Sequence, residues 1–342
     1  MLKTERMDRV RAALRAQGLT QMIVCDPKSV WYLTGVAVEP YERLLALYLP
    51  TEGEPVLFLN RLFNVPEPPC RTVWHTDTDK PVAQIAEVVD AGKPLGIDKE
   101  WPAKFLIPLM ETHPGMQVVL SSDCVDDCRA CKDAEEQTLM REASRINDAV
   151  NEAAKHYIKA GMTEREVAEF IDAQFRAHGC EGPSFTTIVS FGANAADPHH
   201  EPDDTVLKEG DCVLFDMGCV KSRYCSDMTR TWFCGQPTEK QAAVHDLVRR
   251  ANEAAEALIK PGVRLCELHD VLPARITDVL ERALPEEAAM PFSSSSNSRD
   301  SPSIPSKHTF TFPGSRRAES PFSAVWGMAV RPAISLSRRG VR

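Results

Sequence analysis

An internal repeat constrains the fold of this chain more than any other feature of its sequence. Residues 151–162 read NEAAKHYIKAGM and residues 252–263 read NEAAEALIKPGV, at an offset of 101 residues. The similarity continues at three aligned pairs, which are Glu166 and Glu267, Val167 and Leu268, and Ile171 and Leu272. Because duplicated units usually pack against each other to bury a common core, the repeat predicts two related halves. A second set of strands is then expected near residues 286–334.

The sequence beyond Ala283 does not continue this pattern. Ser and Pro supply about a third of the residues from 291 onward, and proline interrupts every candidate strand. One hypothesis is a disordered regulatory tail over 284–342, and the other is a frame-shifted or wrongly joined coding region. We favour the second, because the repeat stops in the middle of a unit. In either case we expect no regular secondary structure in residues 284–342.

Residues 1–122 are expected to form a separate N-terminal domain. They open with a stretch of mixed Lys, Glu, Arg and Asp over 1–18, which is typical of a surface helix and lacks the apolar segment of a signal peptide. Strand-like runs follow at 22–24, 44–49 and 56–59. Strands that alternate with helices indicate a mixed α/β domain.

Residues 129–283 have a different pattern, in which long helices precede the strands. Apolar residues recur at helical spacing over 139–158, and Gly161 is expected to end that helix. Thr163-x-x-Glu166 has the form of a capping box that opens the next helix. Strand-like segments are then predicted at 185–191, 213–217 and 228–233, and a third amphipathic helix at 239–259. The predicted fold class of the whole chain is α/β (α+β).

Composition and charge limit the classes of partner. The formal net charge of −9 argues against a nucleic acid or an anionic membrane, because those partners bind basic patches. No apolar run approaches the roughly 20 residues that span a bilayer. Cytoplasmic residence is the default expectation, and the eleven cysteines are then expected to be reduced thiols instead of a disulfide framework.

Three of these cysteines form a separate pattern. Cys124, Cys128 and Cys131 have the CxxxCxxC spacing that holds an iron–sulfur cluster in some enzymes. Their acidic surroundings and the run into a long helix favour a linker without a cluster. We keep the linker as the working interpretation and the cluster as its alternative.

The segment at 212–233, CVLFDMGCVKSRYCSDMTRTWF, is the strongest candidate for chemistry. Asp216 and Asp227 lie in neighbouring strand-like runs, where Asp is depleted. One interpretation is that 216–218 forms a turn and Asp227 a local cap. The other is that both carboxylates point to one side and bridge a pair of divalent cations. Two such ions roughly 3.5–4 Å apart polarise a scissile carbonyl and lower the pKa of a shared water.

A loop upstream supplies two histidines. His199 and His200 follow Pro198 in GANAADPHHEPDD. A lone loop histidine is most often a surface residue. Two histidines close to a candidate metal site favour a role in hydrogen bonding to a developing oxyanion or leaving nitrogen.

Four phrases, in order along the chain, carry a family resemblance. They are GANAADPH at 192–199, LKEGD at 207–211, FDMG at 215–218 and SDMTRT at 226–231. Together they resemble the catalytic domain of the Xaa-Pro peptidases, the prolidase, aminopeptidase P and creatinase family with the pita-bread fold. RACKDAE at 129–135 resembles the start of that domain, and residues 1–122 resemble the family's creatinase-type N-terminal domain. The resemblance covers about 1–283 and accounts for the repeat, because the pita-bread fold consists of two related halves.

The resemblance implies roles for three residues. Asp216 would be the terminal ligand of one metal, Asp227 a bridging ligand, and His199 the catalytic histidine that contacts the substrate near the scissile bond. The implied cofactors are two divalent metal ions, Mn or Co and less selectively Zn. The implied substrate is a short proline-containing peptide cleaved before proline, by a dipeptidase or an aminopeptidase, and a homodimer is compatible with the family.

The rest of the family's ligand set has no match in this sequence. The missing ligands are a histidine in a Gly-rich HGxGH-like motif and two glutamates. His308 lies in KHTF, which has no such glycines, and Glu319 lies between Ala318 and Ser320. We therefore expect an incomplete pita-bread domain with impaired metal binding and activity, because each cation needs more donors than two aspartates supply.

Two alternatives to a peptidase remain open. Creatinase dispenses with the metals, so the retained aspartate pair counts against it. A non-catalytic remnant or binding module of the same fold fits the missing ligands. In either case, the strands at 213–217 and 228–233 are expected to lose partners and leave unpaired edges.

Overall fold

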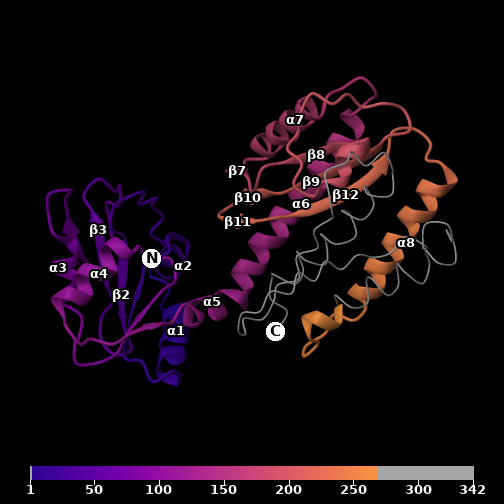
Figure 1. Ribbon diagram of the computed structural model, residues 1–342. Coiled ribbons are helices and arrows are strands. Elements are labelled where there is room, and N and C mark those ends of the chain that lie inside the picture. The colour runs from indigo at the N-terminus through magenta and orange to yellow at the C-terminus, as the bar shows by residue number, and fades with distance from the viewer. Residues whose placement is uncertain (1, 269–342) are drawn as a thin grey trace, which may run out of the picture. The chain divides into compact units, whose positions relative to one another are not determined.

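The computed structural model describes residues 2–268, in two compact units (Figure 1). The first unit is Met1–Lys132 and the second begins at Asp133. The strands expected near 286–334 and the tail at 284–342 lie outside the described residues. The domain limits drawn from the sequence stay a prediction. Within the described part of the chain, no helix combines the length and the apolar character needed to cross a bilayer.

The first unit is built on a six-stranded mixed sheet with the strand order β4-β3-β2-β1-β5-β6. Its strands are β1 (Gln21–Val24), β2 (Ala46–Pro50), β3 (Val56–Asn60), β4 (Arg71–His75), β5 (Leu95–Ile97) and β6 (Val118–Leu120). β1 runs antiparallel to β2 and parallel to β5, which is parallel to β6. The three strand-like runs predicted from the sequence correspond to β1, β2 and β3.

Helices cover both faces of this sheet. They are α1 (Thr4–Ala16), α2 (Pro27–Thr34), α3 (Pro81–Ala86), α4 (Ala103–Thr112) and α5 (Asp123–Ala130). Alternate residues of β1 face opposite sides, because successive side chains of a strand point in opposite directions. Met22 and Val24 pack with α1, α2 and α5, whereas Ile23 packs with α3 and α4. The unit therefore has a hydrophobic core on each side of its sheet.

The second unit packs two long helices on a three-stranded sheet. The helices are α6 (Ala134–Tyr157) and α7 (Glu164–Ala177), and the sheet has the order β12-β9-β8. Its strands are β8 (Ile188–Phe191), β9 (Cys212–Met217) and β12 (Met228–Phe233). Val189, Val213 and Phe215 face the helices and form one core with them. Ile188, Leu214 and Asp216 alternate with these residues and face the other side.

Smaller elements surround this sheet. β7 (Gly182–Pro183), β10 (Cys219–Lys221) and β11 (Tyr224–Cys225) form a second three-stranded sheet in the order β11-β10-β7. The 3₁₀ helix η1 (Gly192–Ala196) follows β8, and α8 (Glu239–Glu256) follows β12. β9 pairs with β8 and with β12, so the expectation that this strand loses partners is wrong. Among the described residues, β12 pairs with one strand, which is β9.

Two helix ends differ from the sequence prediction. α6 ends at Tyr157 instead of Gly161, because Ile158 adopts an extended backbone (φ −66°, ψ 138°). α8 ends at Glu256 instead of Ile259. The capping box of α7 is confirmed, since Glu166 N donates to Thr163 Oγ1 at 3.2 Å and Thr163 N donates to Glu166 Oε2 at 2.8 Å.

The two copies of the repeat share a turn. Gly161 has φ 95° and Gly262 has φ 90°, in the left-handed region that glycine adopts without a steric penalty. In each copy the residue after the glycine donates its N–H to the carbonyl of a lysine, Met162 to Lys159 and Val263 to Lys260, both at 3.2 Å. The repeat therefore corresponds to a repeated local structure.

Candidate metal and peptide site

Asp216 lies in the centre of the sheet of the second unit. It is part of β9 and is 5% exposed. Thr229 of β12 lies directly opposite and donates its hydroxyl to Asp216 Oδ1 at 2.9 Å. The interpretation of 216–218 as a turn is therefore wrong: both neighbouring strands pair with Asp216, and β12 continues the ladder to Met217.

Asp227 immediately precedes β12 and is half-buried. Residues directly opposite in an antiparallel pair share a face, as do residues two apart in one strand. Thr229 shares the face of Asp216, and Asp227 lies two residues before Thr229. The alternation of side chains in β12, continued one residue upstream of Met228, puts Asp227 on the side of Thr229. This favours the same face of the sheet for the carboxylates of Asp216 and Asp227.

The backbone just before Asp227 is held in place. Ser226 is buried, and its N–H donates to Cys219 O at 2.9 Å while Cys219 N donates to Ser226 Oγ at 3.0 Å. Ser184 Oγ donates to the Ser226 carbonyl at 2.8 Å. A Cβ on Gly218 would overlap that carbonyl oxygen. The Gly in FDMG therefore lets the strand that carries Asp216 approach the segment that carries Asp227.

His199 lies on the loop after η1, and the residue is exposed. Its backbone N–H donates to Asp197 Oδ1 at 2.9 Å, which closes a local turn. Among the described residues, one cluster of side chains that could bind a metal ion includes residues of this loop. Its histidine is His200, not His199. The structure thus separates the two histidines of the PHH sequence by environment.

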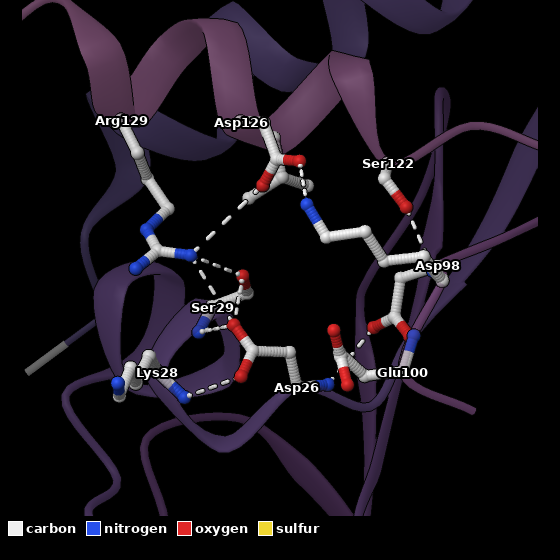
Figure 2. Close-up of a pocket in the computed structure, with 10 residues that line it drawn as sticks. Asp26, Lys28, Ser29, Asp98, Glu100, Ser122, Asp126 and Arg129 are labelled. Carbon is white, nitrogen blue, oxygen red and sulfur yellow. Dashed lines mark hydrogen bonds and ion pairs between the residues drawn. The ribbon is translucent and has the colours of Figure 1, made fainter. Parts of the chain in front are cut away.

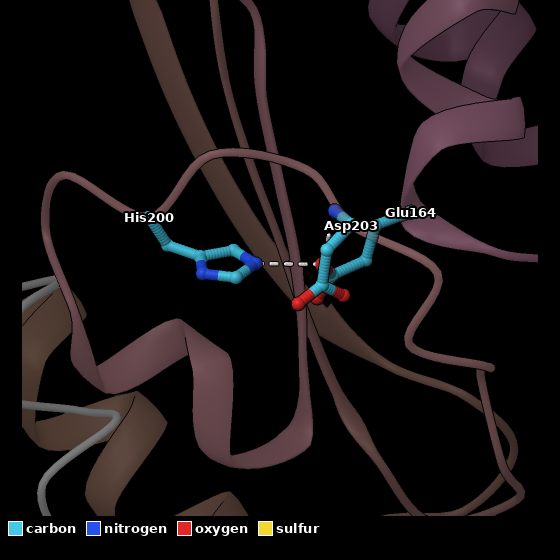
Figure 3. A group of neighbouring side chains, drawn as sticks. All are labelled: Glu164, His200 and Asp203. Carbon is cyan, nitrogen blue, oxygen red and sulfur yellow. Dashed lines mark hydrogen bonds and ion pairs between the residues drawn. The ribbon is translucent and has the colours of Figure 1, made fainter.

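That cluster consists of Glu164, His200 and Asp203, whose ligand atoms all lie within 4.8 Å of one another (Figure 3). Glu164 is the first residue of α7 and is 0% exposed. Its Oε1 accepts from Phe191 N at 2.7 Å and from Asn194 Nδ2 at 3.0 Å. Its Oε2 is 2.6 Å from His200 Nε2 and accepts from Asp203 N at 3.2 Å.

These contacts decide what the group can do. An ionised carboxylate offers about four lone-pair positions and only accepts hydrogen bonds, so His200 Nε2 is the donor. Four N–H groups therefore fill the acceptor capacity of Glu164. A glutamate, a histidine and an aspartate are suitable ligands for a divalent cation, but Glu164 has no lone pair left for one. The group fits a structural role better than a metal site.

Sequence reasoning missed Glu164 and Asp203. The capping box drew attention to Thr163 and Glu166, and neither periodicity nor composition marks Glu164. Thr205 donates two hydrogen bonds to the Asp203 carboxylate, and they lower the pKa of Asp203. The bond from the Thr205 hydroxyl has the larger effect and the bond from its backbone N–H the smaller. This aspartate is itself part of the loop structure.

A polar pocket of about 220 Å³ lies in the first unit, at the carboxyl ends of β1, β5 and β6 (Figure 2). Ligands often bind at such an edge of parallel strands. Ion pairs hold several of its charged groups: Arg129 contacts Asp26 at 3.2 Å and Lys99 contacts Asp126 at 2.5 Å. Burial raises the pKa of Asp98, whose carboxylate accepts three backbone N–H groups. The network joins α5 to the ends of the strands.

The CxxxCxxC cysteines belong to α5 and its end. Cys124 is buried in the core that α5 shares with α1, and burial raises the pKa of its thiol to about 11. Cys128 is half-buried and Cys131 is exposed. The thiolate is the metal-binding form, so this environment counts against an iron–sulfur cluster. The segment is a packed helix where a linker was expected.

Comparison with known proteins adds family information. The chain matches the metallopeptidase family M24 over residues 138–293 and the creatinase/prolidase N-terminal domain over residues 6–131. An uncharacterized peptidase of Staphylococcus epidermidis is 31% identical over 278 residues, which are 80% of this chain and 78% of that protein. An uncharacterized peptidase of Staphylococcus saprophyticus is 32% identical over 282 residues, 80% of this chain and 79% of that protein.

Solved structures agree with this result. The prolidase of Thermococcus sibiricus superimposes with a TM-score of 0.74 at 28% identity, covering 82% of this chain and 78% of that one. Dipeptidase PepE of Mycobacterium ulcerans superimposes with a TM-score of 0.73 at 30% identity, covering 82% and 76%. The chain therefore belongs to metallopeptidase family M24, with a creatinase/prolidase N-terminal domain ahead of its peptidase domain.

Proposed function

We propose that the protein hydrolyses the peptide bond that precedes proline in short peptides, with divalent metal ions as cofactors. One observation carries the proposal: β9 and β12 pair so that Asp216 lies opposite Thr229, two residues from Asp227. This register favours one face of the sheet for both carboxylates, and helices fill the other face. The prolidase and dipeptidase names of the structural relatives support the substrate class.

The donor set fits hard divalent cations. Asp216 is a buried carboxylate oriented by a hydroxyl, and carboxylate oxygens suit Mn or, less selectively, Co and Zn. When bound, such ions would polarise the scissile carbonyl and lower the pKa of a water. Asp216 and Asp227 would hold them, and exposed His199 would donate a hydrogen bond to the substrate near the scissile bond.

The proposal includes impaired activity for this chain. Residues 284–342 contain no HGxGH-like motif, and beyond residue 287 their one glutamate is Glu319. Two aspartates leave most coordination positions to water, so affinity for the ions is expected to be weak. The competing hypothesis is a binding module that keeps the fold without turnover. We also propose cytoplasmic residence and a homodimer, to be tested by fractionation and by light scattering.

Metal content and turnover test the proposal together. The 342-residue chain would be loaded with Mn or Co and assayed on an Xaa-Pro dipeptide, with bound metal measured by atomic emission. We expect slow, chelator-sensitive release of proline, which Asp216→Asn and Asp227→Asn each abolish together with bound metal.

Asp148→Asn is the matched control, because Asp148 is exposed on α6. This variant should behave as the unmodified chain does. A chain that folds but neither binds metal through Asp216 nor releases proline would overturn the peptidase proposal in favour of the binding module.

A further inference from the structure

We propose that Glu164 is a positioning residue, whose buried carboxylate fixes the loop that presents His199. The proposal rests on the proposed function for the role of His199. Its structural part, the anchoring of residues 191–203 by one side chain, stands on contacts within the second unit.

The carboxylate binds the loop at four separate points. Its partners are the backbone of Phe191 and Asp203, the amide of Asn194 and the ring of His200. These residues lie at the end of β8, in η1, at the second histidine of the PHH sequence and just beyond it. Figure 3 shows His200 and Asp203 beside Glu164. His199 lies between two of the anchors, Asn194 and His200. Holding the chain on both sides of His199 restricts where its imidazole can be placed.

The start of α7 adds further contacts to the same loop. The backbone N–H groups of Glu164 and Arg165 donate to Thr205 O at 3.2 Å and to Asp203 O at 3.1 Å. Asn194 Nδ2 also donates to Thr205 Oγ1 at 3.1 Å. The free N–H groups of a helix start need acceptors, and here the loop carbonyls supply them. Loop and helix start therefore form one hydrogen-bonded unit.

A buried charge requires this degree of compensation. Removing a carboxylate from water is unfavourable unless hydrogen bonds replace its hydration. Glu164 receives four N–H donors and lies at the positive end of the α7 dipole. Glu166, two residues later, is exposed and bonds only within the capping box. The contrast separates a residue that organises the loop from a neighbour that organises its own helix.

Substitutions at both ends of the His200 contact test the proposal. Glu164→Gln converts one acceptor oxygen into a donor that faces N–H groups. Amide exchange of Phe191 and Asp203 should then accelerate about tenfold or more, while exchange in β9 is unchanged. Peptide turnover should lose kcat by about 10- to 100-fold with a smaller change in KM, because an ångström of misplacement can cost that much.

His200 provides a second pair of variants in case Glu164→Gln fails to fold. His200→Phe removes the donor and should reproduce the faster exchange at Asp203. His200→Gln retains an N–H donor and should restore slow exchange. Glu166→Gln is the matched control and should leave exchange in the loop and the ratio of kcat to KM unchanged.

Amide exchange does not depend on turnover, so the anchoring role can fail or succeed independently of the peptidase proposal. Unchanged exchange at Phe191 and Asp203 in Glu164→Gln would overturn the anchor. Stoichiometric Mn or Zn that is lost in Glu164→Gln and kept in Asp216→Asn would also overturn it, because Glu164 would then be a metal ligand.

Discussion

At the scale of single residues, the pair of Asp216 and Thr229 is the most informative contact. Both lie in strands, opposite each other, and a 2.9 Å hydrogen bond joins their side chains. Groups that hydrogen-bond a metal ligand fix its orientation, and their loss typically costs about 10- to 100-fold in metal affinity. Thr229 is therefore expected to matter for binding although it is not itself a proposed ligand.

Thr229→Val tests this role, since valine keeps the shape of threonine and removes the hydroxyl. We expect Mn affinity to fall by about tenfold, with little change in stability, as measured by calorimetric titration. Thr231→Val serves as the control, because Thr231 lies two residues along β12 opposite Leu214. Equal losses in the two variants would contradict a specific role for Thr229.

At the scale of elements, the start of α7 links helix stability to the loop. Thr163 caps the helix and also forms an isolated bridge with Val206, at the far end of the loop anchored by Glu164. An N-cap side chain satisfies one of the free N–H groups of the first turn. The same few residues thus support both the helix and the loop that carries His199.

Thr163→Ala should lower the free energy of unfolding of the second unit by about 1 kcal/mol, because the capping hydrogen bond is lost. Urea unfolding followed by circular dichroism measures this change. Thr138→Ala is the comparison, since Thr138 lies inside α6, is exposed and bonds only to Ala134 O. Alanine has the higher helix propensity, so that variant should be neutral or slightly stabilising. A loss at Thr138 as large as at Thr163 would argue against the cap.

The repeat shows how far sequence reasoning reaches at this scale. The equivalent turns at Gly161 and Gly262 could be predicted, because glycine and its neighbours set the backbone locally. The end of α6 could not be predicted from Gly161. Residues 158–160 lie beyond the helix, and the N–H of Gly161 bonds to Leu207 O, a contact 46 residues away in sequence. Long-range pairing ended the helix earlier than the local signal indicates.

At the scale of the whole molecule, the first unit is compact and has hydrophobic cores of its own. Its sheet is covered on both faces by its own helices, and its two cores draw on residues of this unit alone. Roughly 130 residues is a normal size for an independent domain. The second unit keeps one well-filled core between α6, α7 and the sheet.

A fragment of residues 1–132 is therefore expected to fold alone. Its thermal unfolding by circular dichroism should be a single cooperative transition, because its buried apolar surface is internal. Leu47→Ala, in β2, should lower the midpoint of this transition, since a fully buried leucine side chain is lost. A gradual, non-cooperative melt of the fragment would contradict its independence.

The sequence alone determined the family, the capping box of α7 and the strands β8, β9 and β12, since strand alternation, capping boxes and short motifs are local patterns. Asp216, Asp227 and His199 stay proposed site residues that rest on those short motifs. Only the tertiary structure decided that Asp216 faces Thr229 and that Glu164 binds four parts of one loop. Those relations join residues 13 to 39 positions apart, and their geometry follows from strand register and helix packing, which no local pattern specifies.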